Sequence, residues 1–176
     1  MKIVSIFANR LYAVRYKGQR IDELRRLMKL WHDPMYVYAF LKENAADLPQ
    51  NKTLGELVAI IAENAKIINT TLHEKVKNKN NSLDEFFKPL NNQEYSERIL
   101  SLQKGREQYL RLYAVKIGNN CFAITGGAIK FTHLMQDRPH TSVELDKIKL
   151  CRDYFNNAGV FDEDSFYELV NEHNND

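Results

Sequence analysis

The chain has 176 residues, of which 44% are hydrophobic and 11% aromatic, so it can bury a core and has the size of one ordinary domain. It contains no run of about eighteen or more apolar residues, which excludes a membrane-spanning helix of the usual length. The apolar start at residues 1–7 is too short for a signal peptide. We therefore expect one cytoplasmic domain over residues 1–176.

The net charge of +2 hides an uneven distribution along the chain. Residues 88–152 carry 11 Lys and Arg against 6 Asp and Glu, whereas residues 153–176 carry 7 acidic residues and no Lys or Arg. The basic middle indicates an anionic partner such as a nucleic acid. Charges scattered over solvated surfaces explain the same composition, so charge alone leaves both interpretations open.

The first predicted elements are one strand and two helices. Residues 11–16 alternate apolar and polar side chains as a strand does. Residues 21–31 repeat apolar side chains at helical spacing. Asp33 followed by Pro34 predicts an N-cap and first helical position, and therefore a second helix directly after the first.

Two capping-box patterns predict further helices. Thr53 and Glu56 begin the longest amphipathic stretch, which ends in the polar residues 75–81. Ser82 and Glu85 repeat the pattern before residues 86–90 and predict a short helix there. Helical spacing of apolar side chains predicts another helix over residues 93–103.

The pattern then changes to that of strands. Residues 109–117 and 121–125 alternate on either side of a Gly-Asn-Asn turn, which predicts a β-hairpin. Gly126 and Gly127 permit a tight connection into a third short strand over residues 128–132.

Two helices should follow the strands. Thr141 and Glu144 predict a capped helix that ends at Gly159, and Asp162 predicts the start of the last helix. We expect an α+β fold in which a small antiparallel sheet of about four strands packs with several α-helices.

The usual motifs of metal and cofactor sites are absent from the sequence. There is no phosphate-binding or dinucleotide glycine pattern, no His-Glu-x-x-His, no Cys-x-x-Cys and no Gly-x-Ser-x-Gly. Cys121 and Cys151 lie in apolar surroundings, where two buried free thiols are more typical than a disulfide. We predict neither a metal site nor a cofactor.

Basic side chains gather instead on the predicted sheet and the segments flanking it. Several cations converging on one phosphate stabilise the charge that grows when a ribose 2′-hydroxyl attacks that phosphate, and a histidine can transfer the proton. The alternative is that these side chains pair with surface carboxylates or form ordinary hydrogen bonds. The candidates are Lys104, Arg106, Arg111, Lys116, Lys130, His133, Arg138 and His140.

Part of the second half resembles the HigB-like branch of the RelE/ParE toxin superfamily. The resemblance is carried by the strand at residues 128–132, by Pro139 after a polar linker, and by the helix at residues 144–154. Residues 111–115 resemble the family's central strand, which an arginine opens. The toxin-like sheet would span residues 104–155.

The resemblance implies site residues and a reaction. Arg111 and Lys130 would bind the scissile phosphate, and Phe131 stands where the family has a second lysine. The candidate catalytic residues are Arg111, Lys130, His133 and His140, and the candidate RNA-binding residues are Lys104, Arg106, Lys116 and Arg138. Family members cleave mRNA, on the ribosome or free, without a metal.

The family's biology sets the remaining expectations. A cognate antitoxin protein neutralises such toxins, while the ParE branch poisons gyrase instead of cutting RNA. Residues 19–91 form a helical expansion beyond the compact family core. A non-catalytic regulatory protein that binds nucleic acid or protein is the alternative function.

Overall fold

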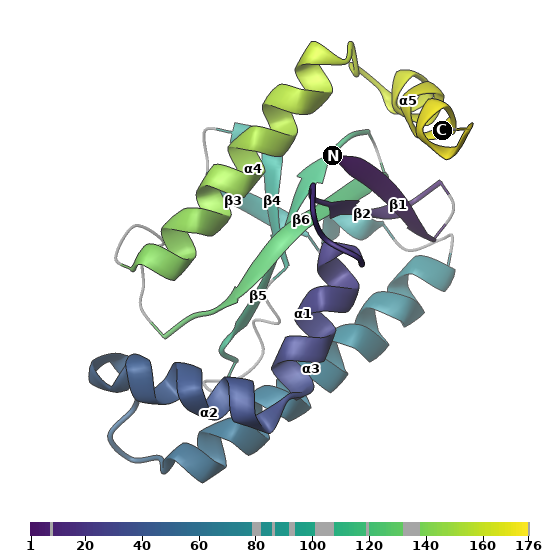
Figure 1. Ribbon diagram of the computed structural model, residues 1–176. Helices are drawn as coiled ribbons and strands as arrows, with labels where there is room; N and C mark the ends of the chain where they lie inside the picture. Colours follow the sequence, from purple (N-terminus) through teal and green to yellow (C-terminus); the bar gives the residue numbers. More distant parts are fainter. Residues whose placement is uncertain are drawn as a thin grey trace.

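The computed structural model describes residues 1–7, 9–78, 82–85, 87–91, 94–100, 108–118, 120–131 and 138–175. Its elements form a mixed sheet covered by helices on both faces (Figure 1). The strands are β1 (Lys2–Phe7), β2 (Leu11–Arg15), β3 (Lys88–Asn91), β4 (Glu94–Leu100), β5 (Leu110–Lys116) and β6 (Phe122–Ile129). The helices are α1 (Glu23–His32), α2 (Pro34–Glu43), α3 (Leu54–Lys77), α4 (Pro139–Asn157) and α5 (Glu163–Asn175), with 3-10 turns at Ala45–Asp47 and Leu83–Glu85.

The sheet has the order β1-β2-β6-β5-β4-β3. Every neighbouring pair is antiparallel except β2 and β6, which run parallel over only three residue pairs. The predicted α+β class is confirmed, and the sheet is larger than expected and mixed. Strand β1, at the start of the chain, covers residues for which the sequence pattern predicted no helix or strand.

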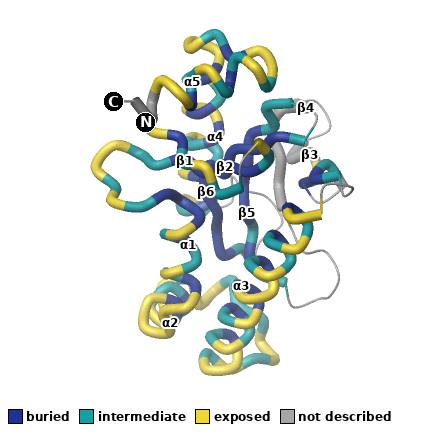
Figure 2. Tube along the Cα trace, turned by 90° about the vertical axis from the view of Figure 1, so that its right-hand side faces the viewer, coloured by how far each residue is buried: buried dark blue, intermediate teal, exposed yellow. Residues whose placement is uncertain are grey.

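Helices cover the two faces of the sheet with different partners. Helices α1 and α3 pack against the face that carries Leu110, Leu112 and Ala114, forming the larger apolar core. Helix α4 packs against the opposite face, where Tyr113 and Val115 point. Figure 2 shows β5 and β6 as the buried centre between these covers. Within the described residues, no helix is long and apolar enough to cross a membrane.

Local sequence signals position several of the helices as predicted. The Asp33 carboxylate accepts hydrogen bonds from the backbone at the start of α2, with Pro34 in its first turn. Thr53 and Glu56 form the full capping box of α3. Gly159 has a φ of 72°, the left-handed conformation that follows a helix end.

Some predicted elements are wrong, and the reason is tertiary pairing. The described part of residues 93–103 forms β4 rather than a helix, because its backbone pairs with β5 on one side and β3 on the other. In place of the predicted short helix at residues 86–90, the described residues form a 3-10 turn at Leu83–Glu85 and then β3. Pairing in a sheet thus overrides weak helical spacing.

Gly126 and Gly127 do not form a turn between two strands. They lie inside β6, which continues to Ile129. A Cβ on Gly127 would lie 2.6 Å from the Arg111 carbonyl oxygen and 2.9 Å from the Leu27 side chain. Glycine at this position therefore allows α1 to pack closely on the strand.

Helix α4 begins earlier than its predicted cap. Its first residue is Pro139, and the Thr141 hydroxyl donates to the Arg138 carbonyl oxygen (2.9 Å) instead of capping the helix. Glu144 is thereby available for a different role. Both cysteines are buried free thiols, as predicted, and burial raises the pKa of Cys151 to about 11.

Candidate functional site

Three of the predicted site residues lie at one end of β5 and β6, and we call them the cationic end: Arg111, Lys130 and His140. Arg111 lies opposite Ala128 in the strand register, on the face that α4 covers. Lys130 follows the end of β6, and its backbone N–H donates to the Tyr109 carbonyl oxygen (2.7 Å). By alternation along the strand, its side chain leaves on the same face as that of Ala128.

The Arg111 guanidinium is half-buried and bound to the backbone. Its Nη1 donates to the carbonyl oxygens of Gln108 and Leu110, both at 2.9 Å. No described carboxylate forms an ion pair with it. Burial lowers the pKa of this guanidinium, although an arginine stays charged at neutral pH.

His140 is fixed by contacts on two sides. Its Nε2 lies 3.0 Å from the Ile129 carbonyl oxygen, and its ring packs edge-on against Phe40 with centroids 5.0 Å apart. Because a carbonyl oxygen only accepts, the contact implies that Nε2 carries the hydrogen. In that tautomer Nδ1 carries the lone pair and is the acceptor of the ring.

Two other predicted cations are engaged in ion pairs. Lys116 lies at the far end of β5, where its Nζ is 2.7 Å from Asp84. Arg138 pairs with Asp47, which joins the start of α4 to the turn after α2. Lys104, Arg106 and His133 lie outside the described residues. The catalytic and RNA-binding assignments stay predictions.

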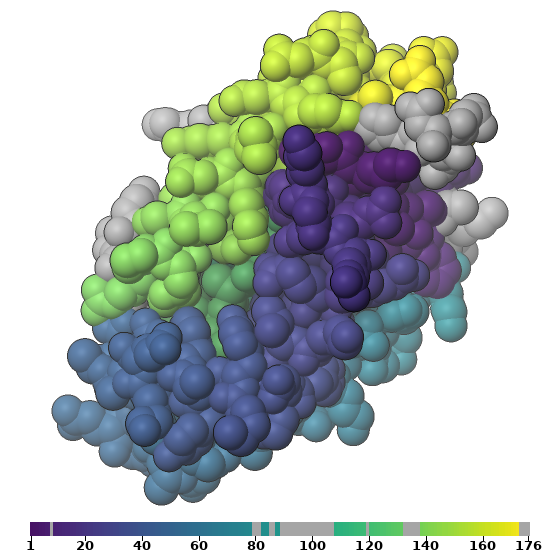
Figure 3. Space-filling view, viewed as in Figure 1, coloured from purple at the N-terminus to yellow at the C-terminus, as the bar shows by residue number. Residues whose placement is uncertain are grey.

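A pocket of about 240 Å³ opens beside the cationic end. The parallel pairing of β2 with β6 stops at Ala13 and Ile124, and beyond it the Tyr16 hydroxyl donates to the Thr125 carbonyl oxygen (2.7 Å). The last residues of β6 therefore have β5 on one side and a gap on the other. In Figure 3 this gap lies where the light green of α4 meets the blue of α1 and α2.

We call this cavity the edge pocket. Since Lys130 bonds to β5 and the Ile129 carbonyl bonds to His140, alternation directs the main-chain groups of Gly127 and Ile129 towards the gap. The pocket thus offers backbone donors and acceptors as well as side chains. It is lined by Arg26, Leu27, Trp31, Tyr36, Phe40, Gly127, Ala128, Ile129, His140, Val143, Glu144 and Lys147.

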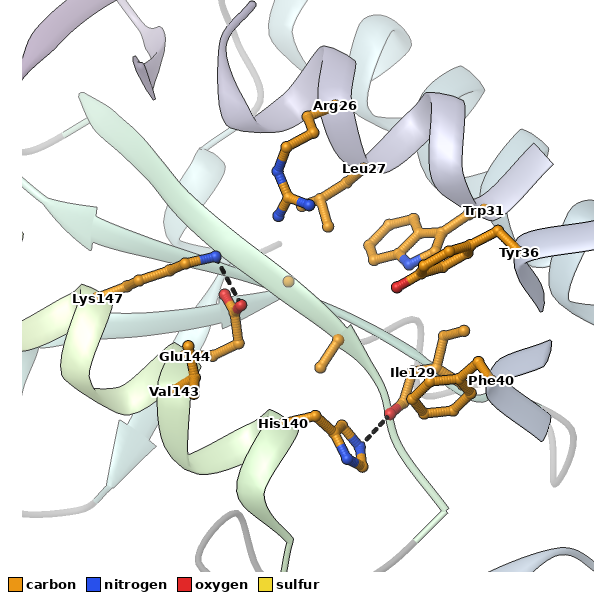
Figure 4. Close-up of a pocket in the computed structure, with 12 residues that line it drawn as sticks. Arg26, Leu27, Trp31, Tyr36, Phe40, Ile129, His140, Val143, Glu144 and Lys147 are labelled. Atoms are coloured by element: carbon orange, nitrogen blue, oxygen red, sulfur yellow. Dashed lines mark hydrogen bonds and ion pairs between the residues drawn. The ribbon is translucent and has the colours of Figure 1, made fainter. Parts of the chain in front are cut away.

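One wall of the edge pocket is charged, because Arg26, Glu144 and Lys147 line it. Together with Glu23, which binds Arg26 and Lys147, we call these four side chains the seam. Arg26 donates to both oxygens of Glu23, at 2.7 and 2.8 Å. Lys147 bridges the two helices, with Nζ 3.2 Å from Glu23 and 2.8 Å from Glu144. Figure 4 shows Lys147 bonded to the Glu144 carboxylate on the same helix and Arg26 on the helix that faces them.

The two carboxylates of the seam have opposite pKa shifts. Burial disfavours ionisation of Glu23, but the hydrogen bonds from Arg26 and the charge of Lys147 outweigh it and lower the pKa. Burial raises the pKa of Glu144 despite the attraction of Lys147. Glu144 is 6% exposed, and its Oε2 has no hydrogen-bond partner among the described residues. A buried carboxyl oxygen without a partner marks a candidate ligand contact.

Gly126 in β6 makes room for this carboxylate. A Cβ on Gly126 would lie 1.9 Å from the Glu144 Oε2. Any larger residue at position 126 would therefore displace the Glu144 side chain.

The opposite wall of the edge pocket is aromatic. Trp31 is buried, while Phe40 is half-buried and Tyr36 is 38% exposed at the rim. Figure 4 shows these three rings facing α4 across the gap. The pocket therefore combines an aromatic wall with charged and main-chain hydrogen-bonding groups, as a site for a polar planar ring would.

Sequence reasoning missed most of the edge pocket. His140, Glu144 and Lys147 have the spacing that places side chains on one face of a helix, and this signal could have grouped them. The sequence pattern places Glu144 in a helix cap instead, whereas it lies inside α4. Glu23 and Arg26 show the same spacing on α1, but nothing local indicates that α1 and α4 meet.

The described residues hold no cluster of three or more His, Cys, Asp or Glu side chains placed to bind a metal ion. The site holds side chains of the types that proteins use for proton transfer, His140 and Glu144, and positively charged side chains at the cationic end. In the comparisons, no family model, no characterised protein and no solved structure matches this chain.

Proposed function

We propose that this chain is the toxin component of a toxin–antitoxin system, an endoribonuclease that cleaves mRNA in the cytoplasm. The observation that carries the proposal is the grouping of Arg111, Lys130 and His140 at one end of β5 and β6. Its expected partners are a cognate antitoxin and the ribosome, and both expectations rest on the family resemblance.

The proposed reaction uses the ribose 2′-hydroxyl as nucleophile. His140 Nδ1 takes the 2′ proton while the 2′ oxygen bonds to phosphorus and the bond to the 5′ oxygen breaks. The products are a 2′,3′-cyclic phosphate and a 5′-hydroxyl, whose proton comes from water or from a second acid. Arg111 and Lys130 stabilise the negative charge on the phosphoryl oxygens.

The arrangement of His140 supports its role as the base. Its Nε2–H is held by the Ile129 carbonyl, which orients Nδ1 as the acceptor. Arg111 supports the phosphate site because its described partners are carbonyl oxygens, and no carboxylate of the described residues compensates its positive charge. Such a half-buried guanidinium is suited to a phosphate.

A labelled oligoribonucleotide of mixed sequence and its all-deoxy counterpart test the reaction. We expect wild-type protein to cut only the ribose form and to leave a cyclic phosphate. His140→Ala should lose about 10²–10⁴-fold in rate, and Arg111→Lys roughly 10²-fold. Lys66→Ala is the matched control, because Lys66 is exposed on α3 and lies 3.9 Å from Glu63, outside the proposed site.

The same variants separate the two candidate functions. Induced expression in bacteria should arrest growth with cut transcripts, and His140→Ala should abolish both effects. A second candidate, a non-catalytic binding protein, is favoured by the ion pairs of Lys116 and Arg138, which engage two of the predicted cations. Soluble wild-type protein that binds the RNA without cutting it would replace the first proposal with this one.

A further inference from the structure

We propose that the edge pocket binds a single guanine base, with Glu144 reading its Watson–Crick edge. This inference rests on the proposed function in one respect, because an RNA-cleaving protein would use the pocket to select the nucleotide at its cleavage site. The pocket lies directly beside His140, which lines it.

Size and shape favour one ring system over a larger ligand. The pocket holds about 240 Å³, less than the roughly 300–1,000 Å³ of sites for drug-sized ligands. Tyr36 at the rim and Phe40 deeper in provide ring surfaces on one wall, and Val143, which is 52% exposed, adds an apolar contact on the other. Aromatic and apolar surfaces of this kind stack on nucleobases.

Hydrogen-bond complementarity selects the base. The carboxylate of Glu144 only accepts when ionised, and its Oε2 has no described partner. Guanine offers two adjacent donors, N1–H and the 2-amino group, followed by the O6 acceptor. The main-chain N–H groups of Gly127 and Ile129 face the same gap and are suited to O6.

The other bases fit this set of partners less well. Adenine and cytosine present a ring nitrogen acceptor beside their amino group, which an ionised carboxylate repels. Uracil presents one donor between two acceptors. Burial raises the pKa of Glu144, and Lys147, 2.8 Å from its Oε1, opposes this shift by stabilising the ionised form that binds guanine.

Calorimetric titration of the purified protein with guanosine, inosine, adenosine and cytidine 5′-monophosphates tests the proposal. We expect the guanosine nucleotide to bind about tenfold or more tightly than the adenosine and cytidine nucleotides. Inosine lacks only the 2-amino group, so its nucleotide should fall between them. Equal affinity for all four nucleotides would overturn the proposal.

Glu144→Gln is the decisive variant, because it replaces one acceptor with a donor at unchanged size. It should lose the preference for guanosine over inosine and adenosine while the protein stays folded, as followed by circular dichroism. Asp146→Asn is the matched control, since Asp146 is exposed on the same helix. Retention of the guanosine preference in Glu144→Gln would sink the assignment of Glu144.

The two proposals fail separately. Guanosine nucleotide binding without RNA cleavage would retain the base site and remove the endoribonuclease. Cleavage without any preference for guanosine-containing sites in the oligoribonucleotide would retain the enzyme and remove the base site. Calorimetry identifies the first case. Replacing each guanosine in the oligoribonucleotide by inosine identifies the second, because cleavage is then unchanged.

Discussion

The helices that cover the sheet differ in the kind of side chain that they bury. Helix α3 buries an almost entirely apolar stripe, in which Asn64 is the one polar residue and accepts from the Tyr109 backbone N–H (2.9 Å). The seam between α1 and α4 instead buries two carboxylates, Glu23 and Glu144. Burial of apolar side chains stabilises a fold, whereas the attraction between buried charges is largely offset by the hydration that they lose. The seam is therefore less stabilising than an apolar contact of the same size would be, which is typical of functional sites.

The largest loss of stability should come from a substitution in the apolar stripe of α3. Ile61 is fully buried under the sheet, so Ile61→Ala should lower the free energy of unfolding by about 3–4 kcal/mol through lost burial and a cavity. Urea denaturation measures this loss. Ile67→Ala is the control, because Ile67 is 36% exposed on the same helix, and it should cost less than about 1 kcal/mol. Equal losses at both positions would mean that α3 does not carry this core.

Breaking the seam should cost somewhat less. Glu23→Gln leaves Arg26 and Lys147 without their shared buried anion. Removing one partner of a buried pair costs roughly 3–5 kcal/mol, and we expect the low end, about 3 kcal/mol, because the side chains of Arg26 and Lys147 are still 29% and 21% exposed.

The control for Glu23→Gln is a surface pair. Glu63 is 59% exposed and lies 3.9 Å from Lys66, so Glu63→Gln should change stability by at most about 0.5 kcal/mol. Since the pKa of Glu23 is lowered, its stabilisation is present above the ordinary carboxyl pKa and is lost as the pH falls through its folded value. The difference in the free energy of unfolding between Glu23→Gln and wild type should therefore shrink towards zero in acid. A difference that is constant with pH would contradict an ionised Glu23.

Local sequence signals correctly predicted where helices α2 and α3 begin. The capping box at Thr53 and Glu56 and the Asp33-Pro34 pair act within one helical turn, so the residues that make them are visible in sequence. The hairpin of β5 and β6 is confirmed for the same reason. The strand β4 was missed because its pairing with β5, not its own side-chain spacing, decides its conformation.

The seam could not be predicted, because it depends on contacts between distant segments. Lys147 and Glu23 are 124 residues apart, and no periodicity relates them. The contact exists because β2 ends early and leaves an edge of β6 against which α1 and α4 meet. Gly127 contributes by letting α1 approach, although in sequence it looked like part of a turn.

The smallest expected effect concerns the pH dependence of stability at Glu144. Burial raises the pKa of this carboxyl in the folded protein, so the unfolded chain loses the proton at lower pH than the folded one. Stability contributed by Glu144 is therefore present in acid and is lost as the pH rises through its folded value. Glu144→Gln removes this pH dependence of stability, since the amide does not titrate.

Urea denaturation of wild type and Glu144→Gln between about pH 4 and pH 8 measures the difference. The variant should gain stability relative to wild type as the pH rises, because its amide does not titrate while its oxygen still accepts the hydrogen bond from Lys147. Asp146→Asn on the exposed face of α4 should show no such trend. A higher free energy of unfolding of Glu144→Gln at high pH alone would show that the ionised Glu144 destabilises the wild-type fold. A difference between the two proteins that does not change with pH would mean that ionised Glu144 does not destabilise the fold, and that the seam is an ordinary structural ion pair.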